Sequence, residues 1–148
     1  MPADDRPARI LIAEDTPQAA ELLEAYLADT DYEVRVASDG EQTLREVAAW
    51  QPDLILLDIM MPRISGFEVC KRLRANPATH GIAILMITAL DQHSDFERAV
   101  EAGTDEFLSK PITKADLLRR IPALLAAKRQ KSDLDRALSY IEEVEKKE

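Results

Sequence analysis

The sequence predicts an α/β protein built on a parallel five-stranded sheet, and two observations predict it. Short apolar runs alternate with longer amphipathic stretches five times along 148 residues. The runs at 54–57 and 84–87 are apolar at every position, which is typical of strands covered on both faces. Strict alternation indicates right-handed crossovers with helices on both sides of the sheet. With the first strand central, we expect the flavodoxin-like strand order 2-1-3-4-5.

The predicted strands and helices are bounded by residues with clear turn and capping preferences. Strands are expected at residues 9–13, 33–37, 53–57, 83–88 and 105–109. Helices are expected at about 17–29, 41–50, 65–75 and 92–102, with a fifth starting after Thr113. Thr16 and Pro17 suit the N-cap and first turn of the first helix. Gly103 suits the residue that ends the fourth helix, and Thr113 with Asp116 resembles a capping box.

Composition indicates one globular domain with an acidic body. The chain has 46% hydrophobic and 32% charged residues and a net charge of −9, and a domain of this size buries enough surface to fold unaided. Residues 128–148 carry six basic and six acidic side chains, so the whole acidic excess belongs to residues 1–127. This charge argues against direct nucleic-acid binding, which needs clustered Lys and Arg.

Neither a secretory signal nor a membrane-spanning run is evident in the sequence, so a cytoplasmic location without membrane partners is expected. The single cysteine, Cys70, excludes an internal disulfide. It lies in an apolar helical pattern and is therefore expected in the core.

The residues that follow the predicted strands carry the chemistry. Glu14 and Asp15 follow the first strand, Asp58 the third, Thr88 ends the fourth and Lys110 follows the fifth. Ligands of such sheets bind beyond the carboxyl ends of the strands. We therefore expect these five side chains to converge.

Three carboxylates at one sheet edge need a cation, because two unit charges about 4 Å apart repel by about 4 kcal/mol at an effective dielectric near 20. Oxygen ligands with room for water fit Mg²⁺. A carboxylate beside such a cation can attack a phosphoryl donor and form an aspartyl phosphate. Asp58 is the candidate nucleophile, while Thr88 and Lys110 can donate to the phosphoryl oxygens.

These positions lie in segments that together resemble the receiver domain of response regulators in two-component signalling. The matching segments are Glu14-Asp15, residues 58–66, Thr88-Ala89 and residues 103–111, and the resemblance spans residues 8 to about 127. It implies that Asp58 is the phosphoacceptor and that a sensor histidine kinase or a histidine phosphotransfer protein is the donor. The strand order expected above is partly taken from this resemblance.

The resemblance further implies a ligand set and a switch. Asp15, Asp58 and the carbonyl of Met60 would bind Mg²⁺ directly, with Glu14 acting through water. Phe107 matches the switch aromatic that turns inward as Thr88 moves, and Ala89 is small enough for that movement. Periodicity alone would make Phe107 a core aromatic. The family also implies a cis bond between Lys110 and Pro111.

The resemblance describes a switch that phosphorylates and dephosphorylates itself rather than a turnover enzyme. The surface of the fourth helix, fifth strand and fifth helix would control dimerisation or partner binding. Apolar residues at Met60 and Leu90, where a polar side chain could orient water, predict slow hydrolysis of the phosphoryl group.

Three alternatives remain open. A phosphohydrolase with an aspartyl nucleophile would place a second Asp where Met60 stands. A flavin or nucleotide binder would need a Gly-rich or Ser/Thr-rich phosphate loop after the first strand, where Glu14-Asp15 would repel phosphate. A degenerate receiver acting as an interaction module would lack part of the acid, Thr and Lys set.

The C-terminal residues exceed the family pattern. We divide the chain into a receiver domain at 1–127 and a helical extension at 128–148. Leu134, Leu138 and Ile141 form an apolar stripe that one helix cannot bury alone, flanked by Ala137 and Val144, which favours a short coiled coil or dimerisation arm over a solvated helix. Pro122 is expected to kink or break the fifth helix.

Overall fold

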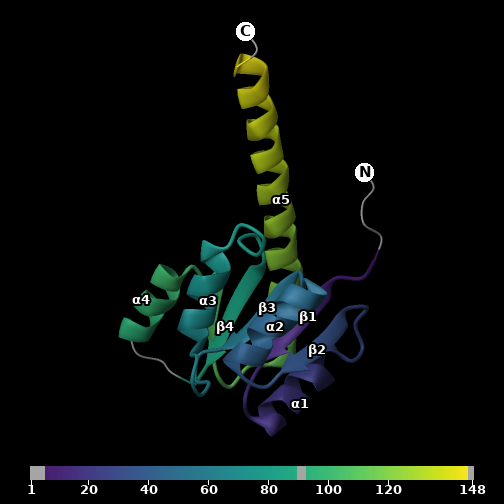
Figure 1. Ribbon diagram of the computed structural model, residues 1–148. Helices are drawn as coiled ribbons and strands as arrows, with labels where there is room; N and C mark the ends of the chain where they lie inside the picture. The colour runs from purple at the N-terminus through teal and green to yellow at the C-terminus, as the bar shows by residue number, and fades with distance from the viewer. Residues whose placement is uncertain (1–5, 90–92, 147–148) are drawn as a thin grey trace.

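The computed structural model describes residues 6–89 and 93–146, and across these residues the chain forms one parallel five-stranded sheet in the order β2-β1-β3-β4-β5 (Figure 1). The strands are β1 (Arg9–Ala13), β2 (Glu33–Ala37), β3 (Leu54–Asp58), β4 (Ala83–Thr88) and β5 (Glu106–Ser109). The helices are α1 (Pro17–Leu27), α2 (Gly40–Trp50), α3 (Gly66–Ala75), α4 (His93–Ala102) and α5 (Lys114–Lys146). The predicted fold class and strand order are therefore confirmed.

The expected boundaries are correct to within one or two residues. The third strand begins and ends one residue later than expected, so that Asp58 is its last residue. The first helix ends at Leu27 rather than near Asp29. The expected start of the fourth helix at Gln92, and the side chain of Leu90, fall outside the described residues.

Helix-capping predictions are correct in position and partly correct in bonding. Thr16 is the N-cap of α1 and Pro17 its first residue, but among the described residues the Thr16 side chain makes no capping hydrogen bond. Thr113 does cap α5, because its hydroxyl accepts from the Asp116 N–H at 3.1 Å. Gly103 follows α4 with a φ of +102°, a conformation that glycine adopts without strain.

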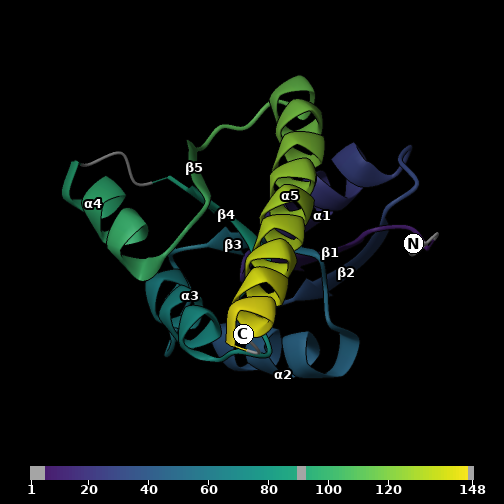
Figure 2. The ribbon, with the colours of Figure 1, turned by 90° about the horizontal axis from the view of Figure 1, so that it is seen from above.

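The sheet is buried on both faces because its alternate residues point into different clusters. One cluster joins Leu11, Ile55 and Ile84 to α2, α3 and α4. The other joins Ile10, Leu54 and Leu85 to α1 and α5. Figure 2 shows the same division, with α2, α3 and α4 on one side of the strands and α1 and α5 on the other.

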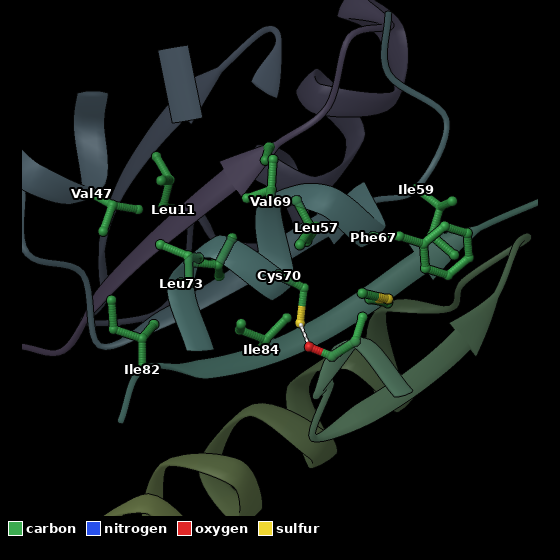
Figure 3. Packing of buried hydrophobic residues seen from close by; sticks show 14 of the residues in the cluster. Leu11, Val47, Leu57, Ile59, Phe67, Val69, Cys70, Leu73, Ile82 and Ile84 are labelled. Carbon is green, nitrogen blue, oxygen red and sulfur yellow. Dashed lines mark hydrogen bonds between the residues drawn. The ribbon is translucent and has the colours of Figure 1, made fainter. Parts of the chain in front are cut away.

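Cys70 is a core residue, as expected. Its thiol lies in the first cluster and donates to the Ala102 carbonyl at 3.2 Å (Figure 3). Burial raises the pKa of this thiol to about 11, so the group stays protonated and unreactive at neutral pH.

The long helix α5 passes through Pro122 without a break, so of the two expected effects the break is wrong and the kink stays a prediction. A proline removes one helical hydrogen bond, here the bond to the Leu118 carbonyl, and the turns on both sides keep the ladder continuous from Lys114 to Lys146. The boundary expected at residue 127 therefore lies inside a single helix. Although α5 is long, no helix in the described ranges is apolar enough over a sufficient length to cross a membrane.

The final turns of α5 project away from the sheet (Figure 1). The helix runs antiparallel to the strands and leaves the body near their starts, where Lys128 lies 3.8 Å from Asp53, the residue before β3. The extension thus emerges at the edge opposite to Asp58, which ends the same strand.

Arg74 joins three segments that are distant in sequence. From the last turn of α3 its guanidinium donates to the carbonyls of Gly103, His80 and Ile82 at 2.6–2.8 Å. It also pairs with Asp105 at 2.8 Å, and Asp105 accepts from the Ile84 N–H at 2.8 Å. This network sets the α4–β5 turn against the start of β4.

We predict that Arg74→Ala lowers the free energy of unfolding by about 2–3 kcal/mol, because it leaves several partly buried acceptors without a donor. Arg72→Ala on the same helix is the matched control. Arg72 makes one exposed pair with Glu68, so its removal should cost less than about 0.5 kcal/mol. Chemical denaturation of both variants measures the difference, and equal losses would show that the network contributes nothing.

Candidate functional site

Three acidic side chains meet at the carboxyl edge of the sheet. Glu14 and Asp15 follow β1, and Asp58 ends β3, the neighbouring strand. One carboxylate oxygen of each lies within 4.8 Å of the others. Glu14 is 2% exposed and Asp58 is 5% exposed, while Asp15 is accessible to solvent. The predicted convergence of these acids is therefore observed.

Lys110 reaches the same edge from the turn after β5. Its backbone N–H donates to the Thr88 carbonyl at 2.7 Å, and the Lys110–Pro111 bond is cis, as the resemblance implied. The ammonium lies 2.9 Å from Glu14 Oε2. Lys110 thus neutralises Glu14 directly, a contact that sequence reasoning did not anticipate.

Asp58 is the acid most perturbed by its surroundings. Burial, and after it the charge and hydrogen bonding of Glu14, raise the pKa of Asp58 from 3.8 to about 7. Lys110 and the Met60 N–H, which donates to Asp58 Oδ1 at 3.3 Å, oppose this rise. Ionised Asp58 is therefore costly unless a cation lies beside it.

The donor set fits Mg²⁺. This ion takes oxygen ligands in a compact octahedral arrangement and keeps several waters. The oxygens of Glu14, Asp15 and Asp58 are close enough to surround one ion, and the accessible position of Asp15 leaves room for water. Asp15, Asp58 and the carbonyl of Met60 would hold the ion, and its charge would relieve the repulsion that raises the pKa of Asp58.

Gly66 sets the position of Asp58, a role that sequence reasoning did not assign. Its N–H donates to the Ile59 carbonyl at 3.0 Å. A Cβ at this position would lie 2.4 Å from the Asp58 carbonyl oxygen and 2.8 Å from the Ile59 Cα. The turn from β3 into α3 therefore folds back closely on the strand, and only glycine fits there.

The expected switch residues differ in burial. Thr88 is fully buried at the end of β4, whereas Ala89 is exposed. Phe107 is partly buried against the first core cluster and meets Phe96 of α4 edge-on, with ring centroids 5.4 Å apart. The packing agrees with a core contribution of Phe107, and its switch role stays a prediction.

A pocket of about 440 Å³ adjoins the acids and includes Asp15 and Met60. Arg98 of α4 lines it as well, with its guanidinium carbon 4.1 Å from the centre of the Phe67 ring. Sequence reasoning missed Arg98, because nothing in a helical pattern indicates which residue of α4 packs against the first turn of α3. The remaining lining residues are Ile59, Met61, Pro62 and Ser65.

Comparison with known proteins agrees with this geometry. Residues 10–122 match the model of the response regulator receiver domain. The chain is 44% identical over 117 residues to the response regulator PleD of Caulobacter vibrioides, covering 79% of this chain and 26% of PleD. It is 41% identical to the DNA-binding dual master transcriptional regulator RpaA of Synechocystis, covering 79% of this chain and 48% of RpaA. The chain thus spans less than half of either relative.

A solved structure also resembles this fold. The receiver domain of the sensor histidine kinase PA1611 from Pseudomonas aeruginosa superposes with a TM-score of 0.76 at 29% identity, covering 81% of this chain and 98% of that one. That structure has a magnesium ion coordinated in its active-site cleft.

We predict that the metal-free protein loses stability as Asp58 ionises. The folded-state pKa is raised, so the contribution of Asp58 is fully present below pH 4 and is lost as pH rises through about 7. Between pH 5 and pH 8 the wild type should lose on the order of 3 kcal/mol more than Asp58→Asn. Thermal unfolding in a chelator measures this, and parallel pH profiles for the two proteins would contradict it.

We predict that Gly66→Ala destabilises the protein by about 1–3 kcal/mol, because the added methyl group forces the β3–α3 turn apart. Gly81→Ala is the matched control, since a Cβ there meets nothing within 4 Å. That control should change stability by less than about 1 kcal/mol. Denaturation midpoints test both, and a Gly66→Ala protein as stable as the control would refute the close approach.

Proposed function

Because this chain belongs to the response regulator receiver family, we propose that it is a phosphorylated switch in which Asp58 accepts a phosphoryl group in a Mg²⁺-dependent reaction. The donor is a phosphohistidine of a sensor kinase or of a phosphotransfer protein. One observation carries the proposal: a buried carboxylate at the end of β3 lies beside Glu14 and Asp15 within reach of one cation. The relatives named above are a response regulator and a transcriptional regulator, which supports a signalling switch.

Each residue of the site has its own role in the proposed phosphoryl transfer. An Asp58 carboxylate oxygen forms a bond to phosphorus as the bond from phosphorus to the donor imidazole breaks, and the imidazole leaves with the electron pair. Mg²⁺, when bound, supplies positive charge to the carboxylates and the phosphoryl oxygens. The Met60 N–H orients Asp58 through Oδ1. The Thr88 hydroxyl and the Lys110 ammonium donate to the remaining phosphoryl oxygens.

Lys110 has two partners in this scheme. Its ammonium already contacts Glu14 at 2.9 Å, and a new anion on Asp58 would compete for it. If Lys110 moved toward that anion, the turn after β5 would move with it. Phe107 lies on β5 itself, three residues before Lys110. Phosphorylation is thereby linked to β5 and to the surface of α4 and α5.

The output surface is proposed to be the face of α4, β5 and α5. Phe96 is 50% exposed and Val100 61% exposed on α4, which leaves an apolar patch beside Phe107. We assign this face and the C-terminal extension to a homodimer whose affinity changes on phosphorylation. The acidic body disfavours nucleic acid as a direct partner. A cytoplasmic location is proposed, because phosphoryl transfer requires the protein to be in the same compartment as its phosphohistidine donor.

Two alternative functions differ from this proposal in what happens to the phosphoryl group. A phosphohydrolase would turn over its phosphoryl group rapidly, although Met60 stands where its second acid would be. A degenerate receiver would bind partners without ever gaining a phosphoryl group, although the acid, Thr and Lys set is complete.

Intact mass spectrometry tests the proposal. After incubation with phosphoramidate or acetyl phosphate and Mg²⁺, the wild type should gain one phosphoryl group, and Asp58→Asn should gain none. Chelation of Mg²⁺ should abolish the gain, because the buried acids then repel the donor. Asp53→Asn is a matched control at the other end of the strand and should be phosphorylated normally. No gain in the wild type would favour the degenerate receiver, and continuous release of phosphate would favour the hydrolase.

A further inference from the structure

The projecting end of α5 carries apolar side chains that nothing in the described chain covers. Leu134 is 58% exposed, and Leu138 and Ile141 are each 50% exposed. They are spaced by four and three residues and so lie on one face of the helix. Three large aliphatic side chains in little more than two turns are a surface that favours burial against another helix.

Charge is segregated along the same segment. Residues 128–138 carry four basic and two acidic side chains, with Lys128, Arg129 and Lys131 at the base. Residues 139–148 carry four acidic and two basic side chains, with Glu142 and Glu145 near the tip. The apolar face lies between the two groups. A second copy of this helix offers the complementary order of charges only when it runs in the opposite direction.

The body of the protein favours the same direction. The extension has equal numbers of basic and acidic residues, so the net charge of −9 belongs to residues 1–127. Parallel extensions would bring two such bodies together at one end of the pair. Antiparallel extensions would separate them by the length of residues 128–146, about 27 Å at 1.5 Å per residue. That distance exceeds the screening length of about 10 Å at 0.1 M salt.

We propose that the extensions of two copies pair as an antiparallel helical dimer, with the basic base of each opposite the acidic tip of the other. Leu134, Leu138 and Ile141 of both copies fill the middle of the pair. This inference rests on the dimer assigned under the proposed function and narrows it. The extensions hold the two copies together, and because the two bodies then lie apart, the α4–β5–α5 face of each copy is left for another partner. Parallel pairing would set the net positive bases against each other and the net negative tips against each other, so it is opposed at both ends.

Charge reversal tests the direction of pairing. Reversing the base with Arg129→Glu and Lys131→Glu, or the tip with Glu142→Lys and Glu145→Lys, should weaken the dimer about tenfold. Combining the four substitutions should restore it, because opposite charges face each other again. These residues lie on the projecting segment, and Lys128 is left unchanged because it contacts Asp53. A parallel dimer would respond differently, since like would still face like in each double variant.

Disulfide trapping gives a second, independent readout. In a Cys70→Ala background, a tagged chain with Lys131→Cys is mixed with an untagged chain carrying Glu145→Cys. Antiparallel pairing should yield mainly the mixed disulfide, whereas predominance of Lys131→Cys homodimers would overturn the inference. Cys70→Ala alone is the control and should yield no disulfide.

The same samples separate this inference from the proposed function. Sedimentation velocity is measured with and without phosphoramidate and Mg²⁺, and mass spectrometry records the phosphoryl group on Asp58. Monomers that gain the phosphoryl group would overturn the helical dimer and leave the phosphoacceptor role intact. Antiparallel dimers that gain no phosphoryl group would support the helical dimer and overturn the phosphoacceptor role of Asp58.

Discussion

Mutual repulsion among Glu14, Asp15 and Asp58 is the constraint on which the functional edge depends. Two of these acids are buried, and a buried carboxylate without a partner would be neutral rather than charged. Two features of the fold reduce this repulsion. Lys110 pairs with Glu14 at 2.9 Å, and Asp58 has a pKa raised to about 7. The edge is consequently a place where a cation or an added phosphoryl group changes the electrostatic balance strongly.

Holding the acids so close requires backbone that approaches closely as well. Gly66 allows α3 to begin against the carbonyl of Asp58, and the Met60 N–H meets the carboxylate from the same turn. The sheet provides the rigid base, because β3 is buried at all of its positions. The acids are therefore positioned by packing that does not itself take part in the chemistry.

Distance separates this edge from the C-terminal extension. The acids lie at the carboxyl ends of β1 and β3, whereas α5 leaves the body where Lys128 meets Asp53, before β3 begins. A change at Asp58 reaches the extension only through packed elements, and α5 itself spans the whole body. A helix that continues through Pro122 without interruption joins the proposed output face to the extension.

The sequence by itself determined the fold class, the strand order expected with the family resemblance, and the residues at the functional edge. Alternation of apolar runs is local information, and parallel strands bring their carboxyl ends together whatever the details of packing. Asp58, Glu14 and Asp15 could be found for that reason. The apolar stripe around Leu138 was also evident, since helical spacing shows directly which residues share a face.

Only the tertiary structure decided how those residues pair and which neighbours support them. Lys110 pairs with Glu14, Arg98 lies over the ring of Phe67, and Arg74 joins α3 to the α4–β5 turn. These contacts join residues whose separation in sequence carries no periodic signal, so their partners depend on helix packing and side-chain reach. The continuity of α5 through Pro122 was likewise decided by the surrounding turns, because one missing hydrogen bond is a local cost that the rest of the helix can offset.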